Sequence, residues 1–377
     1  MKILVAGDFC PRDRVTEYFD RNDYASVLGE IKEVVNNADY SIVNFECSVT
    51  KGGERPIVKV GPNLSSSEVG IKALEWLGVK GLTLANNHLY DYGYEGILNT
   101  LQLCKKYQLD TVGGGLNFYE ASKVLYKKIG GKMIAIINCC ESEFSIATET
   151  SAGCNPLNPI QQYYAIKDAK RQADYVLAIV HGGPEHFQLP SPRMQETYRF
   201  FIDAGADAVI NHHQHCISGY EIYKEKPIFY GIGNFCFDNK LNNSKLWYDG
   251  LLILIEFGPK ISFEIIPINQ CEKSAKVHLL NYSYVQDKIR ELNDIINSPN
   301  TLKRAIEHYY DSQINNYFTD IFEPINNRLY FACKSRGWLP TFIGNRRVLI
   351  AYNYIWCEAH RDRVLYKLRK LYENIAK

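Results

Sequence analysis

The sequence NHHQH at positions 211–215 places three histidines within four residues, directly after the apolar run 208–210. Imidazole is a common protein ligand for divalent metal ions, and three such rings at the end of a strand-like run favour a metal site over a structural role. In an extended segment, His213 and His215 point to the same side and can bind one ion or two neighbouring ions. We therefore predict that these two side chains hold metal.

Four further polar motifs also follow apolar, strand-like runs. They are Asp8 after residues 2–6, Glu46 after 40–45, Asn87, His88 and Asp91 after 82–85, and His181 after 175–180. Ligands gather at the carboxyl ends of strands in α/β sheets, so we expect these motifs to meet in space. Asp91, three residues after His88, can orient that imidazole and raise its basicity. Taken alone, Asp8 could equally cap a turn or a helix, and Glu46 could be a surface residue.

The expected ligand set mixes carboxylate, amide and imidazole groups. Such ligands suit Mn, Fe or Zn rather than a soft thiolate site. A pair of these ions catalyses phosphoryl or related hydrolysis by activating a water and by holding both the attacking and the leaving oxygen. The residues thus predict a hydrolase that uses divalent metal ions, with two as the expected number.

Short β-type runs alternate with amphipathic segments over the first two-thirds of the chain. This alternation predicts an α/β fold with mostly parallel strands. The runs 251–257 and 261–268, separated by Gly-Pro-Lys, predict a closing hairpin. One apolar face at helical spacing, formed by Val27, Leu28, Ile31, Val34 and Val35, predicts a single helix. Beyond residue 270 the pattern becomes helical, so we place two domains at 1–270 and 271–377.

Composition and charge exclude several classes of protein. The chain has 377 residues and a formal net charge of +1, so no attraction of the whole molecule to nucleic acid is predicted. The sequence contains neither a signal-peptide core nor an apolar run long enough for a membrane span, which predicts a cytoplasmic protein. The 11 cysteines form no CxxC pair and indicate buried thiols in a reducing compartment.

The last segment, 361–377, carries many cations among Leu, Tyr and Ile. A solvated helix face with an apolar stripe explains this pattern. Peripheral contact with a membrane or with a polymer-synthesis complex, through the C-terminal helices, is the alternative.

These five motifs and a sixth at residues 233–238, in their order along the chain, resemble a known family. The order is GD, N-x-E, NNH-x-x-D-x-G, H-x-G-x-E, HH-x-H and GNF-x-FD, and it is similar to the CapA (poly-γ-glutamate capsule synthesis) family of the calcineurin-like metallophosphoesterase superfamily. The match spans about residues 1–270. The resemblance implies a metallophosphoesterase-like two-sheet β-sandwich flanked by helices, rather than a single open sheet.

The resemblance also implies roles by position. Asp8 and His215 would hold one metal, Asn87, His181 and His213 the other, and Glu46 would bridge the two. His88 would stand over the substrate and protonate the leaving group or stabilise the oxyanion. Where the superfamily commonly has a second histidine ligand, this chain has Cys10, which leaves either a thiolate ligand or a site one ligand short; we favour the latter.

Three functions fit these residues. The leading one is a phosphoesterase-like hydrolase that acts on an anionic small-molecule or polymer substrate in capsule or surface-polymer synthesis. The second is amide or γ-glutamyl chemistry on the same ions, and the third is a scaffold subunit with a degenerate site. Arg12 or Arg14 could bind a substrate anion, although we favour a plain surface role for each. Glu185 and Asn234 are candidates for binding substrate or orienting ligands.

Overall fold

The first strand explains the layered fold. In a computed structural model of the chain, strand β1 (Lys2–Phe9) is buried along nearly its whole length. Its alternate side chains enter two different cores: Ile3 and Val5 join one, and Leu4 and Ala6 join the other. A strand that is apolar on both faces must be covered on both faces. The structure describes residues 1–239, 244–322, 328–339, 345–356 and 358–376.

Two sheets form the centre of the first compact unit, which spans residues 1–302. The larger sheet has the strand order β18-β17-β16-β1-β2-β5-β6, and β15 also pairs with β1. The pairs β1–β2, β2–β5 and β5–β6 are parallel, whereas β16, β17 and β18 run antiparallel to their neighbours. Its strands are β1, β2 (Tyr40–Phe45), β5 (Gly81–Thr83), β6 (Asp110–Val112), β15 (Asn234–Cys236), β16 (Asp249–Glu256), β17 (Ser262–Gln270) and β18 (Val277–Leu279).

The smaller sheet has the order β13-β14-β12-β11-β9-β8. Its central pairs β9–β11, β11–β12 and β12–β14 are parallel, and its two edge strands are antiparallel. Its strands are β8 (Leu125–Ile129), β9 (Lys132–Cys140), β11 (Tyr175–His181), β12 (Ala208–His212), β13 (Tyr220–Tyr223) and β14 (Lys226–Phe229). Two-stranded ladders join β3 (Ser48–Val49) to β4 (Ser65–Ser66), and β7 (Gly114–Gly115) to β10 (Gly153–Cys154).

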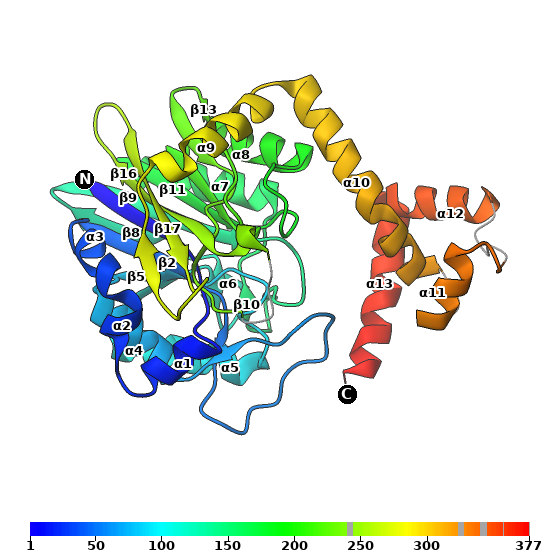
Figure 1. The fold of residues 1–377 in the computed structure, drawn as a ribbon, viewed down its shortest axis with the longest axis horizontal. Coiled ribbons are helices and arrows are strands. Elements are labelled where there is room, and N and C mark those ends of the chain that lie inside the picture. Colours follow the sequence, from blue (N-terminus) through cyan, green and yellow to red (C-terminus); the bar gives the residue numbers. More distant parts are fainter. Residues whose placement is uncertain (240–243, 323–327, 340–344, 357, 377) are drawn as a thin grey trace. The chain divides into compact units, whose positions relative to one another are not determined.

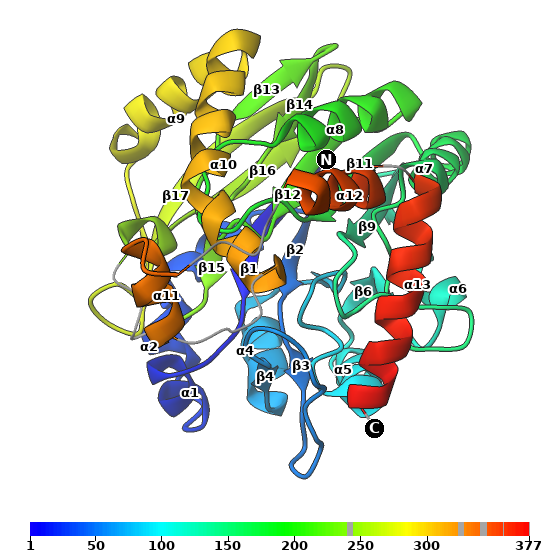
Figure 2. The ribbon, with the colours of Figure 1, turned by 90° about the vertical axis from the view of Figure 1, so that its right-hand side faces the viewer.

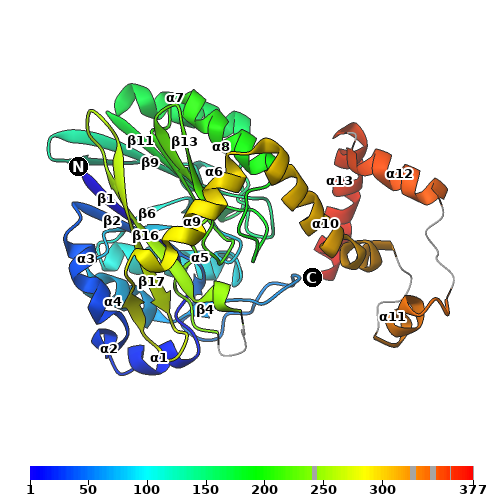
Figure 3. The same ribbon diagram turned by 45° about the horizontal axis from the view of Figure 1, so that its top comes forward.

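The two sheets pack face to face, and helices cover their outer faces (Figures 1 and 3). Aliphatic side chains of both sheets, such as Ile42, Ile136 and Ile179, share the core between the sheets. Helices α1–α5 lie against the larger sheet, and α7 and α8 lie against the smaller one. The helices are α1 (Arg14–Phe19), α2 (Tyr24–Leu28), α3 (Lys32–Asn36), α4 (Glu68–Leu77), α5 (Gly93–Lys106), α6 (Phe118–Ala121), α7 (Pro159–Gln172), α8 (Pro192–Ala204) and α9 (Ser283–Ile296). The structure thus confirms the α/β two-sheet sandwich with flanking helices.

Local sequence sets where these helices begin. Asn158 caps α7 by accepting a hydrogen bond from the Ile160 amide at 3.0 Å, and Ser191 caps α8 by accepting one from the Met194 amide at 3.2 Å. A proline follows each capping residue at the first helical position, where its missing N–H costs nothing. The helix expected around Val27–Val35 is instead divided into α2, a short 3₁₀ turn and α3, with Gly29 at the division.

The second compact unit, residues 303–377, is helical as predicted. It contains most of α10 (Pro299–Phe322), together with α11 (Arg328–Ser335), α12 (Asn345–Trp356) and α13 (Glu358–Ile375). The predicted boundary at residue 270 falls inside the first unit. Helix α9 belongs there because Val285 and Ile289 join the core between the sheets, and Asn293 accepts a hydrogen bond from the Tyr220 amide at 2.7 Å. Among the helices that the structure describes, none is both long and apolar enough to cross a membrane.

One long loop leaves the body of the first unit between β3 and β4. In Figure 2 it is the blue segment that projects beside these two strands. Most of its residues between 51 and 63 are exposed. Its course matters for the site described next, because one of its side chains turns inward.

Candidate metal centre

Asp8 is brought to the site by a very close approach of two backbone segments. A Cβ atom on Gly7 would lie only 1.9 Å from the carbonyl oxygen of Gly233, so residue 7 must be glycine for this packing. Asp8 is fully buried and its Oδ1 accepts a hydrogen bond from Asn44 Nδ2 at 2.7 Å. Burial alone would raise the pKa of Asp8, but the hydrogen bond with His215 and the nearby imidazoles outweigh it and hold this pKa well below its usual value.

Glu46 is the central side chain of the cluster. It follows β2 and is fully buried. Within the part of the chain that the structure describes, neither of its carboxylate oxygens has a hydrogen-bond partner. Burial, and then the charge of Asp8, raises the pKa of Glu46 well above its usual value. A buried carboxylate without a hydrogen bond is costly, so its retention here points to a cation as its partner.

Three neutral donor atoms meet on one side of Glu46. His181 Nε2 lies 3.0 Å from Asn87 Oδ1, 3.0 Å from His213 Nδ1 and 3.5 Å from Glu46 Oε1. Nitrogen and oxygen ligands stand about 2.0–2.2 Å from an ion such as Zn²⁺, so neighbouring ligand atoms lie roughly 3–3.5 Å apart. Burial lowers the pKa of His181, and it lowers that of His213 to about 4, so both rings are neutral near pH 7, as ligands must be.

His215 and Asp8 meet on the other side of Glu46. His215 Nδ1 lies 3.4 Å from Asp8 Oδ2, and its Nε2 lies 3.7 Å from Glu46 Oε1. Burial would lower the pKa of His215, but the hydrogen bond with Asp8 and the charge of this carboxylate raise it. Asn234 Oδ1 lies 2.9 Å from His215 Nδ1, and its Nδ2 donates to the Trp247 carbonyl at 3.0 Å. Asn234 therefore contacts the His215 ring, as the second of its two expected roles, orienting a ligand, would require.

The buried side chains form two groups that could each hold a metal ion. One comprises Glu46, His181 and His213, the other comprises Asp8, Glu46 and His215, and in each group one ligand atom per residue lies within 4.8 Å of the others. Glu46 belongs to both groups, and each group combines side chains from the two sheets. The chemistry of the donors, the neutral imidazoles of His181 and His213, and the carboxylate without a hydrogen bond all fit divalent cations.

The backbone at the histidine motif differs from the sequence expectation. Strand β12 ends at His212, and the next residues are not extended: His213 has φ 89° and His215 has φ 52°. Non-glycine residues in this left-handed region cost about 1–3 kcal/mol each. The two rings do reach the same cluster, with centroids 6.1 Å apart, but through this turn rather than through the alternation of a strand.

His88 and Asp91 form a pair beside the cluster. His88 Nδ1 lies 2.6 Å from Asp91 Oδ2, and both residues are buried. Burial lowers the pKa of His88 against the opposing effect of Asp91. Lys59, from the loop between β3 and β4, contacts the other oxygen of Asp91, and its Nζ lies 3.2 Å from His88 Nδ1. Sequence reasoning missed Lys59, because it lies in a polar loop without a motif.

Two carboxylates lie at the outer side of the histidines. Glu185 is exposed, and although burial acts to raise its pKa, the charges of His215 and His213 lower it below the usual value. Glu143 Oε1 lies 4.0 Å from His213 Nε2, and burial, then the charge of Glu185, raises its pKa. Sequence reasoning also missed Glu143, although it follows β9 near the same sheet edge as His181; a search of every strand end would have found it.

The two candidate arginines are engaged elsewhere. Arg12 pairs with its neighbour Asp13 at 3.5 Å on the surface. Arg14 forms a double hydrogen bond with Asp238, at 3.0 and 2.7 Å, and also contacts the Cys271 carbonyl. These contacts favour surface and structural roles. Cys10 is buried and, in the described residues, it belongs to neither group of potential metal ligands.

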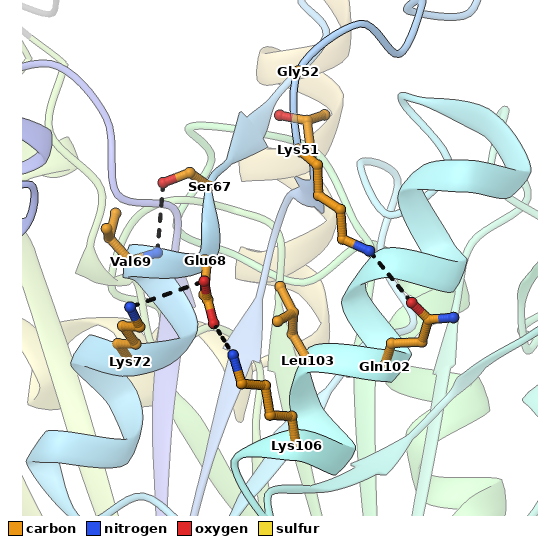
Figure 4. A pocket seen from close by; sticks show the side chains of 10 residues that line it. Lys51, Gly52, Ser67, Glu68, Val69, Lys72, Gln102, Leu103 and Lys106 are labelled. Carbon is orange, nitrogen blue, oxygen red and sulfur yellow. Dashed lines mark hydrogen bonds and ion pairs between the residues drawn. The ribbon is translucent and has the colours of Figure 1, made fainter.

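A separate pocket of about 800 Å³ lies where the loop between β3 and β4 meets α4 and α5 (Figure 4). Its lining residues include Lys51, Glu68, Lys72 and Lys106, and they include no residue of the histidine cluster. Its charges pair with one another: Lys106 Nζ lies 2.7 Å and Lys72 Nζ 3.9 Å from Glu68. The residues that the sequence predicts to bind metal or catalyse a reaction therefore lie at the histidine cluster and not in this pocket.

Comparison with known proteins finds relatives over most of the chain. Residues 2–239 match the family model described as "Bacterial capsule synthesis protein PGA_cap". The chain is 32% identical over 287 residues to "Capsule biosynthesis protein CapA" of Bacillus anthracis, covering 73% of this chain and 69% of that protein. It is 31% identical over 235 residues to "PGA biosynthesis protein CapA" of Bacillus subtilis, covering 62% of each. A solved structure of a hypothetical protein from Thermus thermophilus is similar with TM-score 0.44 and 14% identity, over 71% of this chain and 99% of that one.

Proposed function

The chain belongs to the PGA_cap family of bacterial capsule synthesis proteins, and from this premise we propose that it is a metal-dependent, phosphoesterase-like hydrolase. It would act in the synthesis of a capsule or another surface polymer, such as poly-γ-glutamate. The observation that carries the proposal is Glu46, which is buried between two sets of potential ligands and has no hydrogen-bond partner among the described residues. A carboxylate in this position is well suited to bridge two cations.

The roles of the side chains follow from their contacts. Asp8 and His215 would hold one ion, Asn87, His181 and His213 would hold the other, and Glu46 would be shared by the two groups. The oxygen and nitrogen donors suit Mn, Fe or Zn. When bound, two such ions supply Lewis acidity to the reacting group. His88, held through Nδ1 by Asp91, would present its other nitrogen to the substrate and, in its protonated form, would give the Nε2 proton to the leaving oxygen.

Metal content and hydrolysis of phosphate esters test this proposal together. We expect the purified protein to contain divalent metal and to hydrolyse a phosphodiester or phosphomonoester with added Mn, Fe or Zn. His88→Asn should retain the metal and lose about 10²–10⁴-fold in kcat, as expected for a general acid. His213→Ala should lose metal and activity together. Undetectable metal, with unchanged biological function in His213→Ala, would instead establish a scaffold.

The two outer carboxylates favour a second candidate function. Glu143 and Glu185 lie beside the histidines, where they would repel a doubly charged phosphate. Amide or γ-glutamyl chemistry on the same ions lessens that repulsion at the reacting centre, because an amide carbonyl is uncharged, and relatives with the names given above are named for capsule or PGA biosynthesis. Assays of phosphate esters and γ-glutamyl peptides side by side separate the two candidate functions. If the protein is a phosphoesterase, Glu143→Gln should improve its hydrolysis of phosphate esters; if it acts on amides, this variant should not.

We also propose that the second unit contacts an anionic membrane surface. Residues 303–377 carry 13 Lys and Arg against 7 Asp and Glu, a formal net charge of +6. On α13, Leu365, Leu368 and Leu371 recur every three residues and are exposed. An apolar stripe flanked by cations is typical of helices that lie in a membrane interface.

Vesicle flotation of the full chain tests this contact. Binding to vesicles with anionic phosphatidylglycerol, but not to pure phosphatidylcholine, is expected. The double variant Leu365→Ser/Leu368→Ser should lose binding. Ile160→Ser, which changes an exposed apolar residue on α7 of the first unit, should keep it. Equal binding of both variants, or no binding by the unaltered chain, would refute the proposal.

A further inference from the structure

Lys59 is an unusual residue in its loop. Its neighbour Val60 is 86% exposed, yet the Lys59 side chain is only 3% exposed. Its Nζ contacts Asp91 Oδ1 and lies 3.2 Å from His88 Nδ1 and 3.5 Å from the Asn87 carbonyl oxygen. A lysine head group loses hydration on burial and is retained there only when it is paired. The loop thus places the Lys59 ammonium group beside His88 and Asp91 of the candidate site.

Asp91 connects this loop to His88. Its Oδ2 accepts a hydrogen bond from the Leu64 amide at 2.6 Å and also lies 2.6 Å from His88 Nδ1. Its backbone carbonyl accepts a hydrogen bond from the Ile57 amide at 2.9 Å. Three contacts from the loop therefore converge on the one residue that holds the His88 ring. A change in the position of the loop must act on the direction of the Asp91 carboxylate.

Without Lys59, Asp91 Oδ1 would lose its charged partner. The Asp91 side chain is fully buried, and leaving one of its oxygens without a partner there costs free energy. Rotation of the carboxylate toward another donor would then move Oδ2 away from His88 Nδ1. The ammonium group fixes one oxygen of Asp91, and the other oxygen fixes the imidazole.

We propose that Lys59 is a positioning residue: it clamps Asp91 so that His88 is held through Nδ1 and turns Nε2 to the substrate. This inference rests on the proposed function in one respect, namely that His88 serves the reaction. It makes the loop between β3 and β4 a part of the active site, although most of the loop is exposed. Substituents of the substrate that touch this loop would influence the orientation of His88 as well as binding.

The test compares Lys59→Met with Lys51→Met. Lys51 belongs to the same loop and lies in the pocket of Figure 4, where its Nζ is 3.4 Å from Gln102 Oε1 and does not contact Asp91. Both variants remove the same charge from the same loop. Lys59→Met should lower kcat about 10–100-fold, as the loss of an outer-shell partner does, with KM little changed and the metal retained. Lys51→Met should leave kcat unchanged, and Lys59→Arg should restore part of it.

A spectroscopic measurement separates this inference from the proposed function. With ¹⁵N-labelled histidine, the nine imidazoles give resonances, and His88→Asn identifies that of His88. Lys59→Met should shift the His88 Nδ1 resonance, whereas Lys51→Met should not, whether or not any substrate is hydrolysed. An unchanged His88 resonance in Lys59→Met would overturn the inference. An equal loss of kcat in Lys51→Met would overturn it too. If Lys59→Met fails to fold, a shifted His88 resonance and an intermediate kcat in Lys59→Arg support the clamp, and unaltered values refute it.

Discussion

Charged side chains cluster in two regions of the first unit, and the two regions shift the pKa of a buried or partly buried carboxylate in opposite directions. In the pocket of Figure 4, Glu68 is partly exposed and its pKa is lowered, first by a hydrogen bond with Lys106 and then by one with Tyr107. In the histidine cluster, Glu46 is fully buried, its pKa is raised, and no described residue donates a hydrogen bond to it. The first region satisfies its own charges. The second has a deficit of positive charge, and this deficit, rather than the number of charged groups, marks the candidate metal centre.

Replacing the two glutamates should give the largest contrast. Glu46→Gln removes the carboxylate that both ligand groups share, so we expect metal affinity to fall by roughly 100-fold or more, since even outer-shell changes cost 10–100-fold. Glu68→Gln should leave metal affinity unchanged. Metal titration of both variants, followed by calorimetry, measures the difference. Equal affinity in Glu46→Gln and the unaltered chain would break the comparison.

The backbone of the buried cluster should be equally intolerant of change. Gly7→Ala inserts a methyl group where only 1.9 Å separates it from the Gly233 carbonyl oxygen, so strand β1 and Asp8 must shift. We expect a loss of at least about 2 kcal/mol in the free energy of unfolding. As a control, Gly29→Ala meets no atom within 4 Å and has helical φ, so it should be neutral or stabilising by up to about 1 kcal/mol. Denaturant unfolding distinguishes the two.

Metal binding should release a proton from Glu46. A carboxyl group with a raised pKa keeps its proton above its ordinary value of 4.5, and a cation expels that proton. Affinity should therefore rise with pH, by about tenfold per unit, above pH 4.5 and up to the raised pKa. The pKa values of His181 and His213 are lowered, so these rings release no proton near pH 7. Calorimetry in buffers with different ionisation heats counts the protons, and Glu46→Gln should release about one proton fewer than the unaltered chain.

The exposed pocket should show the smallest effect. The lowered pKa of Glu68 means that its contribution to stability is present above its ordinary value of 4.5 and is lost as the pH falls below it. Because Glu68 is about one-third exposed, solvent weakens this contribution, and Glu68→Gln should shift the thermal midpoint by no more than about 3 °C at neutral pH. The shift should shrink further in about 1 M salt. A large, salt-independent shift would contradict the comparison.

The sequence was most informative where a parallel strand ends. The sequence identifies Asp8, Glu46, Asn87 and His181 because a short apolar run precedes each of them, and ligands gather at the carboxyl ends of such strands. The two-sheet arrangement came from the resemblance in motif order, since strand patterns alone do not reveal how strands divide between sheets. The helical character of residues beyond 270 was also readable from spacing.

Other features depend on tertiary contacts that no local pattern encodes. Lys59 is buried only because a long loop folds back onto Asp91, 32 residues away in the chain. The left-handed conformations of His213 and His215 are held by their surroundings, against the preference of their own residue type. The first compact unit extends to Leu302 because α9 packs on it through Val285 and Ile289.

The pairing of donors from both sheets has one further consequence. Each ligand group combines a carboxylate of the larger sheet with imidazole of the smaller sheet, so a bound ion would act as a cross-link between layers that otherwise adhere through aliphatic side chains. A ligand that binds only the assembled state adds its binding free energy to the stability of that state. Removal of the metal by a chelator should therefore weaken the packing of one sheet on the other. Faster proteolysis of the strands at this interface would detect the loss of stability without any substrate.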